Sequence, residues 1–334
     1  MKKLFHSFTA FLICLTVFNC QDHRLEPIPE PTQFQVSNFV GGLKSPIGMA
    51  IDDKGQIWVT ENGAGNNDGQ ISVISPTGTV HQGIIGFRSI ISPEDGLPAG
   101  LTHLIYKEGK LYILHAVDGK LYTADIANFI AGNPPMAAAV LPSEDLRSFV
   151  LSQNLSNPLN SNLFNLTFGP EGDLYITDAG ANAIIRRNSS SKALSVFAKI
   201  PNLNPMTEPV PTGIVYDGSK FLVSGLGGFP FTDGATKIYQ VDASGNVTDF
   251  KTGYTNLTDI VLTANKKPLV LQFAKFVFNP PANVGFQPMT GQILNENGTV
   301  LLKDLMMPTS IQRSGDKTYY VLSLALGTIQ KLTY

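Results

Sequence analysis

The chain has 334 residues, of which 15% are charged, and its formal net charge is −2. The sequence has no basic stripe, which excludes nucleic acid as an expected partner because phosphate binding needs clustered Lys and Arg. The length allows one large domain or two ordinary ones.

The first residues have the pattern of an export signal. Two lysines precede an apolar run, Leu4 to Phe18, that is short for a membrane span. The run ends in Val-Phe-Asn-Cys, which resembles the lipobox of bacterial lipoproteins, so we expect a signal peptide over residues 1–19 and lipidation of Cys20. Gln21 stands where Asp would favour inner-membrane retention, and we therefore expect a lipid anchor in the outer membrane of the cell envelope. An ordinary signal peptide cleaved near the same place is the alternative.

Residues 20–32 are rich in proline and charge and predict an extended tether between the anchor and the domain. With the signal removed, Cys20 is the one cysteine left, so no internal disulfide is expected. The domain is expected to cover residues 33–334 and to be monomeric.

A hairpin unit recurs along the rest of the chain. Its clearest copy, residues 163–180, has an apolar strand, a Gly-Pro-Glu-Gly turn, a second apolar strand and an Asp-Ala-Gly ending. Copies separated by about 40 to 60 residues are typical of propeller blades. The sequence therefore predicts an all-β, six-bladed β-propeller. The copies begin near Pro46, Gly100, Leu163, Pro211, Asn256 and Pro308.

Each repeat predicts four strands, counted from the axis outward. The second blade is the least regular, and its outer strand is expected anywhere between Ala138 and Ser152. The last repeat ends at Tyr334 after three strands, whereas Gln33 to Val40 is a strand without a repeat of its own. We expect this N-terminal strand to complete the last blade and close the ring. The first blade is predicted at Ile47–Ile51, Gln56–Thr60, Gln70–Ile74 and Thr79–Ile84.

The repeat unit P-x-G-(I/M)…G-x-(L/I)-(Y/W)-(V/I)-T-(D/E)-x-G resembles NHL-type propeller repeats, and the expected architecture is NHL/TolB-like. The stretch Val210 to Ala274 is similar to the ScyD/ScyE family of extracytoplasmic propellers, most specifically at Gly227-Gly228-Phe229-Pro230-Phe231. The resemblance extends over residues 33–334. It implies an extracytoplasmic six-bladed propeller and no defined reaction.

Long insertions are expected on one face of the disc. Because neighbouring strands are antiparallel, the loops before the first strand and after the second strand of each blade share a face. All the long segments fall in this set, whereas the turns of the other face are predicted to be short. This face is therefore the expected functional face. Phe229, Phe231, Phe276 and Phe278 give it an apolar rim that suits a hydrophobic or aromatic ligand, a glycan ring or a protein partner. A lid with a small core of its own is the alternative. The insertions are Phe87–Ala99, Ser143–Asn162, Pro201–Pro209, Gly225–Gly234 and Ala274–Met289.

Polar residues are expected to meet at the mouth of the axial channel on the same face. Aligned positions of the repeats bring together Asn165, Asp259, Glu61, Asp178 and His115, an oxygen-rich set that could hold Ca²⁺. Asn165 and Asp259 resemble two metal-ligand positions of gluconolactonase-type propellers, although Gly48 stands where that family has a carboxylate in the first blade. Channel lining without a metal is the alternative.

The two histidines of the second repeat have different expected roles. His115 with Asp178 or Glu61 could form an acid–base pair. His103 is expected to point into a blade interface.

These observations leave three functions open. The first is non-catalytic binding of a small-molecule or protein ligand, in which Phe229, Phe231, Phe276, Phe278, Glu61, His115 and Asp178 take part. The second is a metal-dependent periplasmic hydrolase or lactonase with its cation at Asn165 and Asp259. The third is a structural component of an envelope complex. No complete catalytic motif is present in the sequence.

Overall fold

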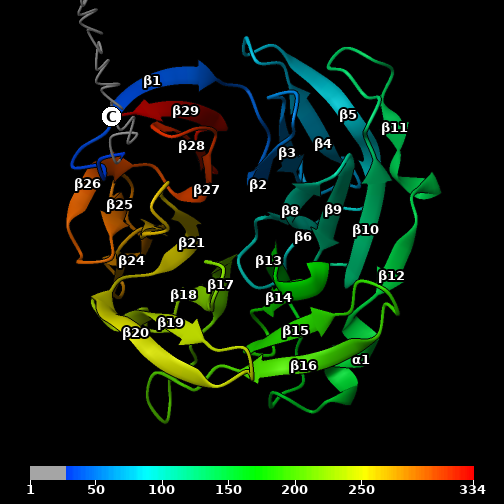
Figure 1. Ribbon diagram of the computed structural model, residues 1–334. Coiled ribbons are helices and arrows are strands. Elements are labelled where there is room, and N and C mark those ends of the chain that lie inside the picture. The colour runs from blue at the N-terminus through cyan, green and yellow to red at the C-terminus, as the bar shows by residue number, and fades with distance from the viewer. Residues whose placement is uncertain (1–27) are drawn as a thin grey trace, which may run out of the picture.

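The computed structural model describes residues 28–334, so the expected signal peptide and Cys20 lie outside the described residues. Six antiparallel sheets surround a central axis (Figure 1), which confirms the predicted six-bladed β-propeller. The four strands predicted for the first blade are present within a residue or so at most of their ends. No helix formed by residues 28–334 is long and apolar enough to cross a membrane.

The blades follow one another in chain order. From the axis outward, blade 1 consists of β2 (Pro46–Ile51), β3 (Ile57–Glu61), β4 (Gly69–Ile74) and β5 (Val80–Phe87). Blade 2 consists of β8 (Leu101–Lys107), β9 (Lys110–His115), β10 (Lys120–Asp125) and β12 (Ser143–Asp145). Blade 3 consists of β13 (Leu163–Phe168), β14 (Leu174–Asp178), β15 (Ala183–Arg187) and β16 (Leu194–Lys199). Blade 4 consists of β17 (Pro211–Tyr216), β18 (Phe221–Gly225), β19 (Thr236–Val241) and β20 (Val247–Tyr254). Blade 5 consists of β21 (Leu257–Leu262), β22 (Pro268–Gln272), β25 (Gly291–Asn295) and β26 (Val300–Leu305). Blade 6 consists of β27 (Pro308–Arg313), β28 (Thr318–Ser323), β29 (Thr328–Thr333) and β1 (Gln35–Val40).

Smaller elements lie between these strands. They are the hairpins β6 (Ile90–Ile91) with β7 (Pro98–Ala99) and β23 (Phe276–Asn279) with β24 (Asn283–Phe286), the short strand β11 (Met136–Ala137), the helix α1 (Arg147–Ser152), and single 3-10 turns at Ala138–Val140 and Pro170–Gly172.

The two ends of the chain close the ring, as predicted. Strand β1 pairs antiparallel with β29, with Gln35 opposite Thr333. Just before β1, the buried ring of Phe34 packs edge-on against Tyr319 and Tyr334, with ring centroids 5.4 and 5.8 Å away. Pairing and packing together leave blade 6 with an outer strand that comes from the opposite end of the sequence.

The second blade departs from the prediction on one point. Its outer strand, β12, lies within the range expected, but residues 126–142 before it form a long connection on the face where only short turns were expected. This segment crosses to blade 1, where β11 pairs in parallel with β5. Phe129 packs on Trp58 at 5.2 Å, and the main-chain N–H of Ala131 donates to Gln56 at 2.6 Å. The connection is long because it covers the outer edge of blade 1.

Hydrophobic cores fill the spaces between neighbouring blades. One cluster joins Trp58 and Ile71 of blade 1 to Leu104 and Ile113 of blade 2, and similar clusters lie between the other pairs of blades. A side chain at such an interface therefore stabilises two blades at once, because each sheet buries both of its faces.

A ring of threonine hydroxyls joins the blades beside the axis. In each blade a hydroxyl donates to a main-chain carbonyl on the innermost strand of the next blade or directly before it, and the sixth bond returns to blade 1. The bonds run from Thr60 to Thr102 (2.6 Å), Thr102 to Leu163 (2.9 Å), Thr177 to Thr212 (2.6 Å), Thr212 to Leu257 (2.9 Å), Thr258 to Pro308 (3.1 Å) and Thr309 to Pro46 (3.5 Å).

Two of these hydroxyls also accommodate an irregularity in the innermost strands. All six of these strands depart from regular pairing near their start. In blade 3 the N–H of Asn165, freed by the irregularity, donates to the Thr177 hydroxyl at 3.0 Å, and in blade 1 Gly48 donates to Thr60 at 2.8 Å. A hydroxyl both donates and accepts, so one side chain replaces a lost sheet bond and makes an inter-blade bond.

Replacing Thr177 with Val should destabilise the whole propeller. The change keeps the shape of the side chain but leaves the Asn165 N–H and the Thr212 carbonyl without their partner, and each unsatisfied buried group costs roughly 1–3 kcal/mol. Urea unfolding of the chain from Gln21 onward measures the effect. The matched control is Thr252→Val on the exposed side of β20. Equal stability of the two variants would contradict the role assigned to the threonine ring.

Candidate functional site

Six equivalent positions of the innermost strands face one another across the axis. They lie in the irregular part of each strand, close to the inter-blade bonds of the threonine ring. Four of them carry polar side chains that are at most 8% exposed, and two carry glycine. The positions are Gly48, His103, Asn165, Gly213, Asp259 and Ser310, which we call the axial residues.

Asp259 is the centre of the hydrogen bonding among the axial residues. One carboxylate oxygen accepts from Asn165 Nδ2 at 3.0 Å and from the N–H of Ile260 at 2.9 Å. The other accepts from Ser310 Oγ at 3.1 Å and from the N–H of Ile311 at 2.9 Å. Burial raises the pKa of the Asp259 carboxyl, whereas the charge of His103 and these hydrogen bonds oppose the rise. Four donors saturate the carboxylate.

His103 reaches across the axis from blade 2. Its Nδ1 lies 3.0 Å from the Phe164 carbonyl of blade 3, and its Nε2 lies 3.3 Å from the Thr309 carbonyl of blade 6. Burial lowers the pKa of His103, opposed by the charge of Asp259 and by the two carbonyls. The main chain of blade 2 approaches blade 1 so closely here that only glycine fits, because a Cβ on Gly48 would lie 2.6 Å from the His103 Cα.

The position of His103 at the axis differs from the prediction, which was a place in a blade interface. The turn between β8 and β9 is shorter than the turn between β2 and β3, so aligning the turn glycines shifts blade 2 by one residue. Another feature of the sequence predicts correctly which residue of each innermost strand is the axial one. Threonine stands one position before the axial residue in four blades, as in Thr102-His103 and Thr258-Asp259.

The expected five-residue cluster at the channel mouth does not form. Asn165 and Asp259 are in direct contact, but Glu61, Asp178 and His115 each bond to groups near their own blade's loops. Glu61 accepts from the N–H of Lys44, from Gln70 and from Ser72. Asp178 accepts from Ser161 and from two main-chain N–H groups, those of Asn162 and Ala181. The strands that carry these residues end away from the axial residues.

His115 is not paired with Asp178 or Glu61. Its Nε2 lies 2.8 Å from the Arg88 carbonyl, and its Nδ1 accepts from the N–H of Asp118 at 3.0 Å. These contacts fit a neutral ring that is protonated on Nε2. Burial lowers the pKa of His115, and the nearby Asp118 carboxylate opposes the shift.

The axial residues do not fit a Ca²⁺ site in this arrangement. A calcium ion needs oxygen lone pairs that point toward it. The oxygens of Asp259 instead face four N–H and O–H donors, and Asn165 Oδ1 accepts from the N–H of Leu166 at 2.7 Å. Within residues 28–334, no three His, Cys, Asp or Glu side chains are placed to hold a metal together.

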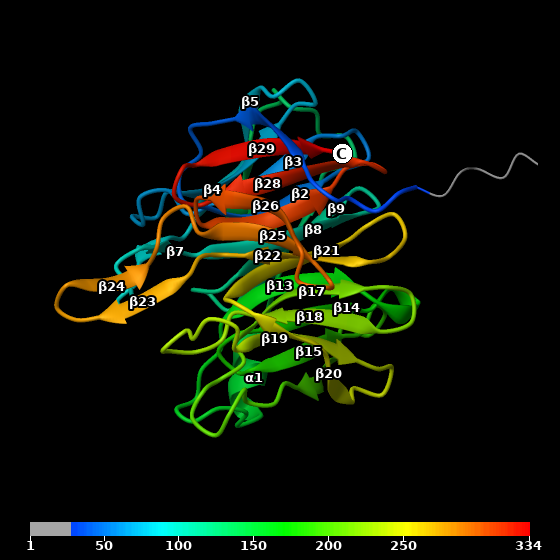
Figure 2. The ribbon, with the colours of Figure 1, turned by 90° about the vertical axis from the view of Figure 1, so that its left-hand side faces the viewer.

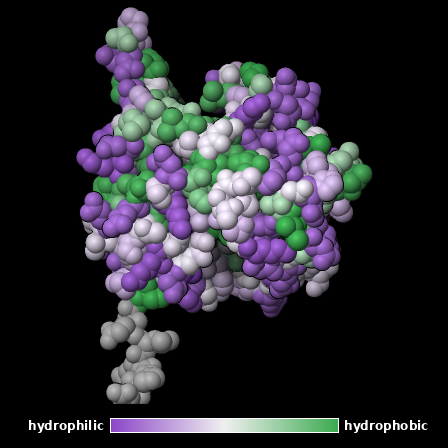
Figure 3. All heavy atoms as spheres, turned by 90° about the horizontal axis from the view of Figure 1, so that it is seen from above, coloured by the Kyte–Doolittle hydropathy of each residue, from purple (hydrophilic) through white to green (hydrophobic). Residues whose placement is uncertain are grey.

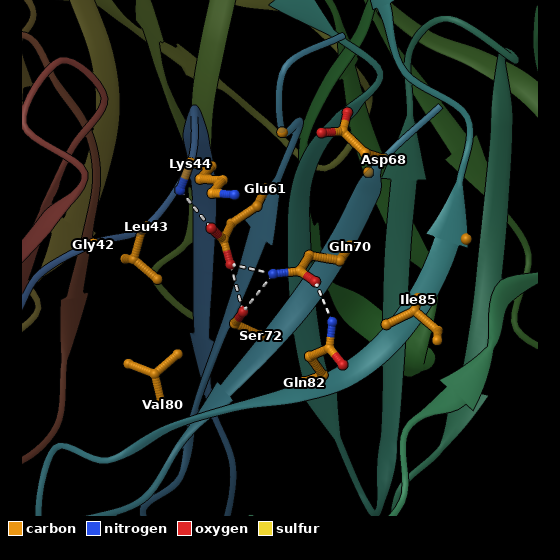
Figure 4. Close-up of a pocket in the computed structure, with 13 residues that line it drawn as sticks. Gly42, Leu43, Lys44, Glu61, Asp68, Gln70, Ser72, Val80, Gln82 and Ile85 are labelled. Carbon is orange, nitrogen blue, oxygen red and sulfur yellow. Dashed lines mark hydrogen bonds between the residues drawn. The ribbon is translucent and has the colours of Figure 1, made fainter. Parts of the chain in front are cut away.

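A polar cavity lies between the linker from blade 6 and the sheet of blade 1. Its volume is about 400 Å³. Figure 4 shows Glu61 beside Gln70 and Ser72, with Gln82 hydrogen-bonded to Gln70, while Leu43 and Val80 lie on one side and Ile85 on the other. The cavity therefore combines a buried carboxylate, amide and hydroxyl groups, and apolar walls.

An aromatic surface is formed by the β23–β24 hairpin and the loop of residues 226–235. Phe229 and Phe278 are each 56% exposed and meet edge-on at 5.1 Å. Beneath them Phe231 and Phe276 pack together at 4.9 Å, and Phe286 contacts both at 5.0 Å. The four phenylalanines predicted for the loop face are thus neighbours. We call Phe229, Phe231, Phe276, Phe278 and Phe286 the aromatic surface; it has a small core of its own and an exposed outer side.

The aromatic surface projects from the disc. Figure 2 shows the β23–β24 hairpin extending from the left side of the ring, and Figure 3 shows the same projection at the upper left. The segment that leads into β1 lies on the opposite side of the ring in Figure 2. There the side chain of Asn265, in the turn between β21 and β22, donates to the carbonyl of Ile28 at 2.7 Å.

No protein-family model matches the chain, and no curated protein matches it in sequence. Solved structures of six-bladed propellers are similar in fold. The virginiamycin B lyase of Staphylococcus aureus is 17% identical, with a TM-score of 0.53, and the match covers 90% of this chain and 100% of that chain. A luciferin-regenerating enzyme is 12% identical, with a TM-score of 0.57 over 90% and 95% of the two chains. A gluconolactonase of Xanthomonas campestris is 9% identical, with a TM-score of 0.55 over 90% and 89%. At these identities the similarity shows the fold alone.

Replacing Asp259 with Asn should destabilise the protein by roughly 2–4 kcal/mol, because an amide has one acceptor oxygen for four donors that bond a charged group. The matched control is Asp249→Asn, whose exposed carboxylate pairs with Lys237 at 2.8 Å and should contribute less than about 1 kcal/mol. Urea unfolding measures both. An Asp259→Asn protein as stable as the control would show that the carboxylate does not hold the axial residues together.

Acid should weaken the fold through His115. Because burial lowers its pKa in the folded state, the unfolded chain binds the proton first as the pH falls below about 6.5, and stability declines by up to ~1.4 kcal/mol per pH unit per proton. His115→Gln should flatten this decline between roughly pH 7 and pH 5. His81→Gln, on the outer strand β5, is the control. Superimposable pH profiles for the wild type and His115→Gln would refute the assignment.

Proposed function

We propose that this propeller is a non-catalytic binding protein of the bacterial cell envelope, which docks a protein partner through the aromatic surface. The observation that carries the proposal is the exposure of Phe229 and Phe278, each 56%, where the loop of residues 226–235 meets a hairpin that projects from the ring. Neighbouring aromatic side chains of this kind are common anchors of protein interfaces. The role as a component of an envelope complex, left open by the sequence, is one form of the same function.

The shape of the aromatic surface favours a protein over a small molecule. Small-molecule sites are concave and enclose most of the ligand. The aromatic surface is a projection, and the cavity of about 400 Å³ lies elsewhere, between blades 6 and 1. A projecting aromatic pair can instead insert into a pocket of a partner, where burial of the two rings supplies binding free energy.

The contacts of the tether favour an orientation in which the aromatic surface points away from the membrane. Residues 28–30 contact the turn between β21 and β22, through Asn265 and through a 3.1 Å bond between Thr263 and Glu30. That turn lies on the face opposite to the aromatic surface. An anchor at Cys20, close in sequence to this contact, would hold the turn face toward the membrane and leave the aromatic surface pointing away from it.

The hydrolase alternative has weaker support. Several structural neighbours are named as enzymes, but the similarity to them extends to the fold alone. The two residues expected to hold a cation are Asn165 and Asp259, and their oxygens face donors. A binding role needs no rearrangement of these residues, whereas metal-dependent hydrolysis needs one.

Cross-linking tests the proposal. A photo-activatable phenylalanine analogue at Phe278 should give a discrete adduct with one envelope protein, and the same analogue at Val300, an exposed apolar position of blade 5, should not. The purified partner should then bind the Phe229→Ala/Phe278→Ala protein at least about tenfold more weakly than the wild type. The Val300→Ala protein should bind like the wild type. Unchanged affinity of the double variant, or no adduct at Phe278, would contradict the proposal.

A further inference from the structure

The cavity between blades 6 and 1 has the chemistry of a second binding site. We propose that it binds a small hydroxylated ligand that carries a primary ammonium group, as an amino sugar does. The site is separate from the aromatic surface and does not depend on the function proposed for that surface. The inference rests on the surroundings of Glu61, on the size of the cavity and on the groups that line it.

Glu61 is a buried carboxylate that forms no ion pair within residues 28–334, although the Lys44 side chain lies beside it at the cavity (Figure 4). Glu61 is 2% exposed, and its three donors are the N–H of Lys44, the amide of Gln70 and the hydroxyl of Ser72. All three donors are neutral. Among the described residues, no Lys, Arg or His forms an ion pair with Glu61. A carboxylate can accept about four hydrogen bonds, so an ammonium group entering the cavity would find both an acceptor and an opposite charge.

A comparison of Glu61 with Asp178 separates a ligand-binding role of Glu61 from a purely structural one. Asp178 ends the second strand of blade 3 as Glu61 ends that of blade 1, and both accept an N–H from the linker that precedes their own blade. Asp178 bonds to residues of its own loops and lines none of the main cavities. Glu61 has one more methylene group and lies at the wall of an open cavity of about 400 Å³. A side chain that only holds the linker, as Asp178 does, does not need the extra methylene group of Glu61.

The remaining walls suit a ring with hydroxyl groups. The hydrogen-bonded amides of Gln70 and Gln82 follow one side of the cavity, at 3.2 Å from each other, and both have further hydrogen-bonding capacity. Leu43, Val80 and Ile85 supply apolar contacts for the carbon faces of a ring. The volume lies within the usual range of small-molecule sites, about 300–1,000 Å³.

Calorimetric titration with glucosamine tests the proposal, with N-acetylglucosamine as the neutral comparison of similar shape. Near pH 6, where such an amine is protonated, glucosamine should bind the wild-type protein at least about tenfold more tightly than N-acetylglucosamine. Glu61→Gln should abolish this preference. Glu94→Gln, which removes the same charge from an exposed loop, should retain it, as should the Phe229→Ala/Phe278→Ala protein.

A second variant keeps the test decisive if Glu61→Gln does not fold. Val80→Trp fills the cavity from its exposed edge without touching the hydrogen bonds of Glu61, and it should remove glucosamine binding while the melting temperature stays near that of the wild type. Equal binding of the two sugars, binding of neither, or undiminished glucosamine binding by folded Glu61→Gln or Val80→Trp protein would overturn the proposal.

Discussion

The structure depends on how six similar sheets meet at a crowded axis. Each innermost strand departs from regular pairing at its start. In blades 1, 3 and 4 a hydroxyl group from the same blade accepts the main-chain N–H that is released. The same kind of hydroxyl donates to the next blade, so that local irregularity and ring closure are coupled. Threonine is suited to this place because its branched side chain fits a strand and its hydroxyl can donate and accept. Removing one such group therefore affects two blades.

The axial residues follow from this geometry. Once the start of each inner strand is turned toward the axis, six side chains compete for little space. Glycine at positions 48 and 213 relieves the crowding, because a Cβ there would meet His103 and Asp259 at 2.6 and 2.7 Å. The polar side chains that remain satisfy one another and the exposed main chain, so they form a structural plug. This explains how a carboxylate, a histidine, an amide and a hydroxyl can lie together without an arrangement ready for metal binding or acid–base chemistry.

The sequence predicted well those features that every repeat shares, and less well those that distinguish one repeat from another. Hairpin spacing and alternation were enough for the six blades and for the completion of blade 6 by β1. A one-residue shift in the alignment of blade 2 was enough to misplace His103, because side-chain direction reverses with each residue of a strand. The crossing of residues 126–142 to blade 1 depends on Gln56, Trp58 and Phe129, whose contacts join distant segments. The aromatic surface was predicted because its phenylalanines are concentrated in two adjacent insertions.

The residues that hold the fold together and the two surfaces proposed for binding lie in different parts of the molecule. The axis, where neighbouring strands are closest, is saturated with internal hydrogen bonds, and opening it to a ligand would cost several of them. Farther from the axis the blades diverge, and the linker between blade 6 and blade 1 leaves the cavity at Glu61. The projecting hairpin is constrained still less, since its rings pack mainly on one another. A propeller of this kind can therefore change what it binds at the rim and on the loop face while the threonine ring and the axial residues stay as they are.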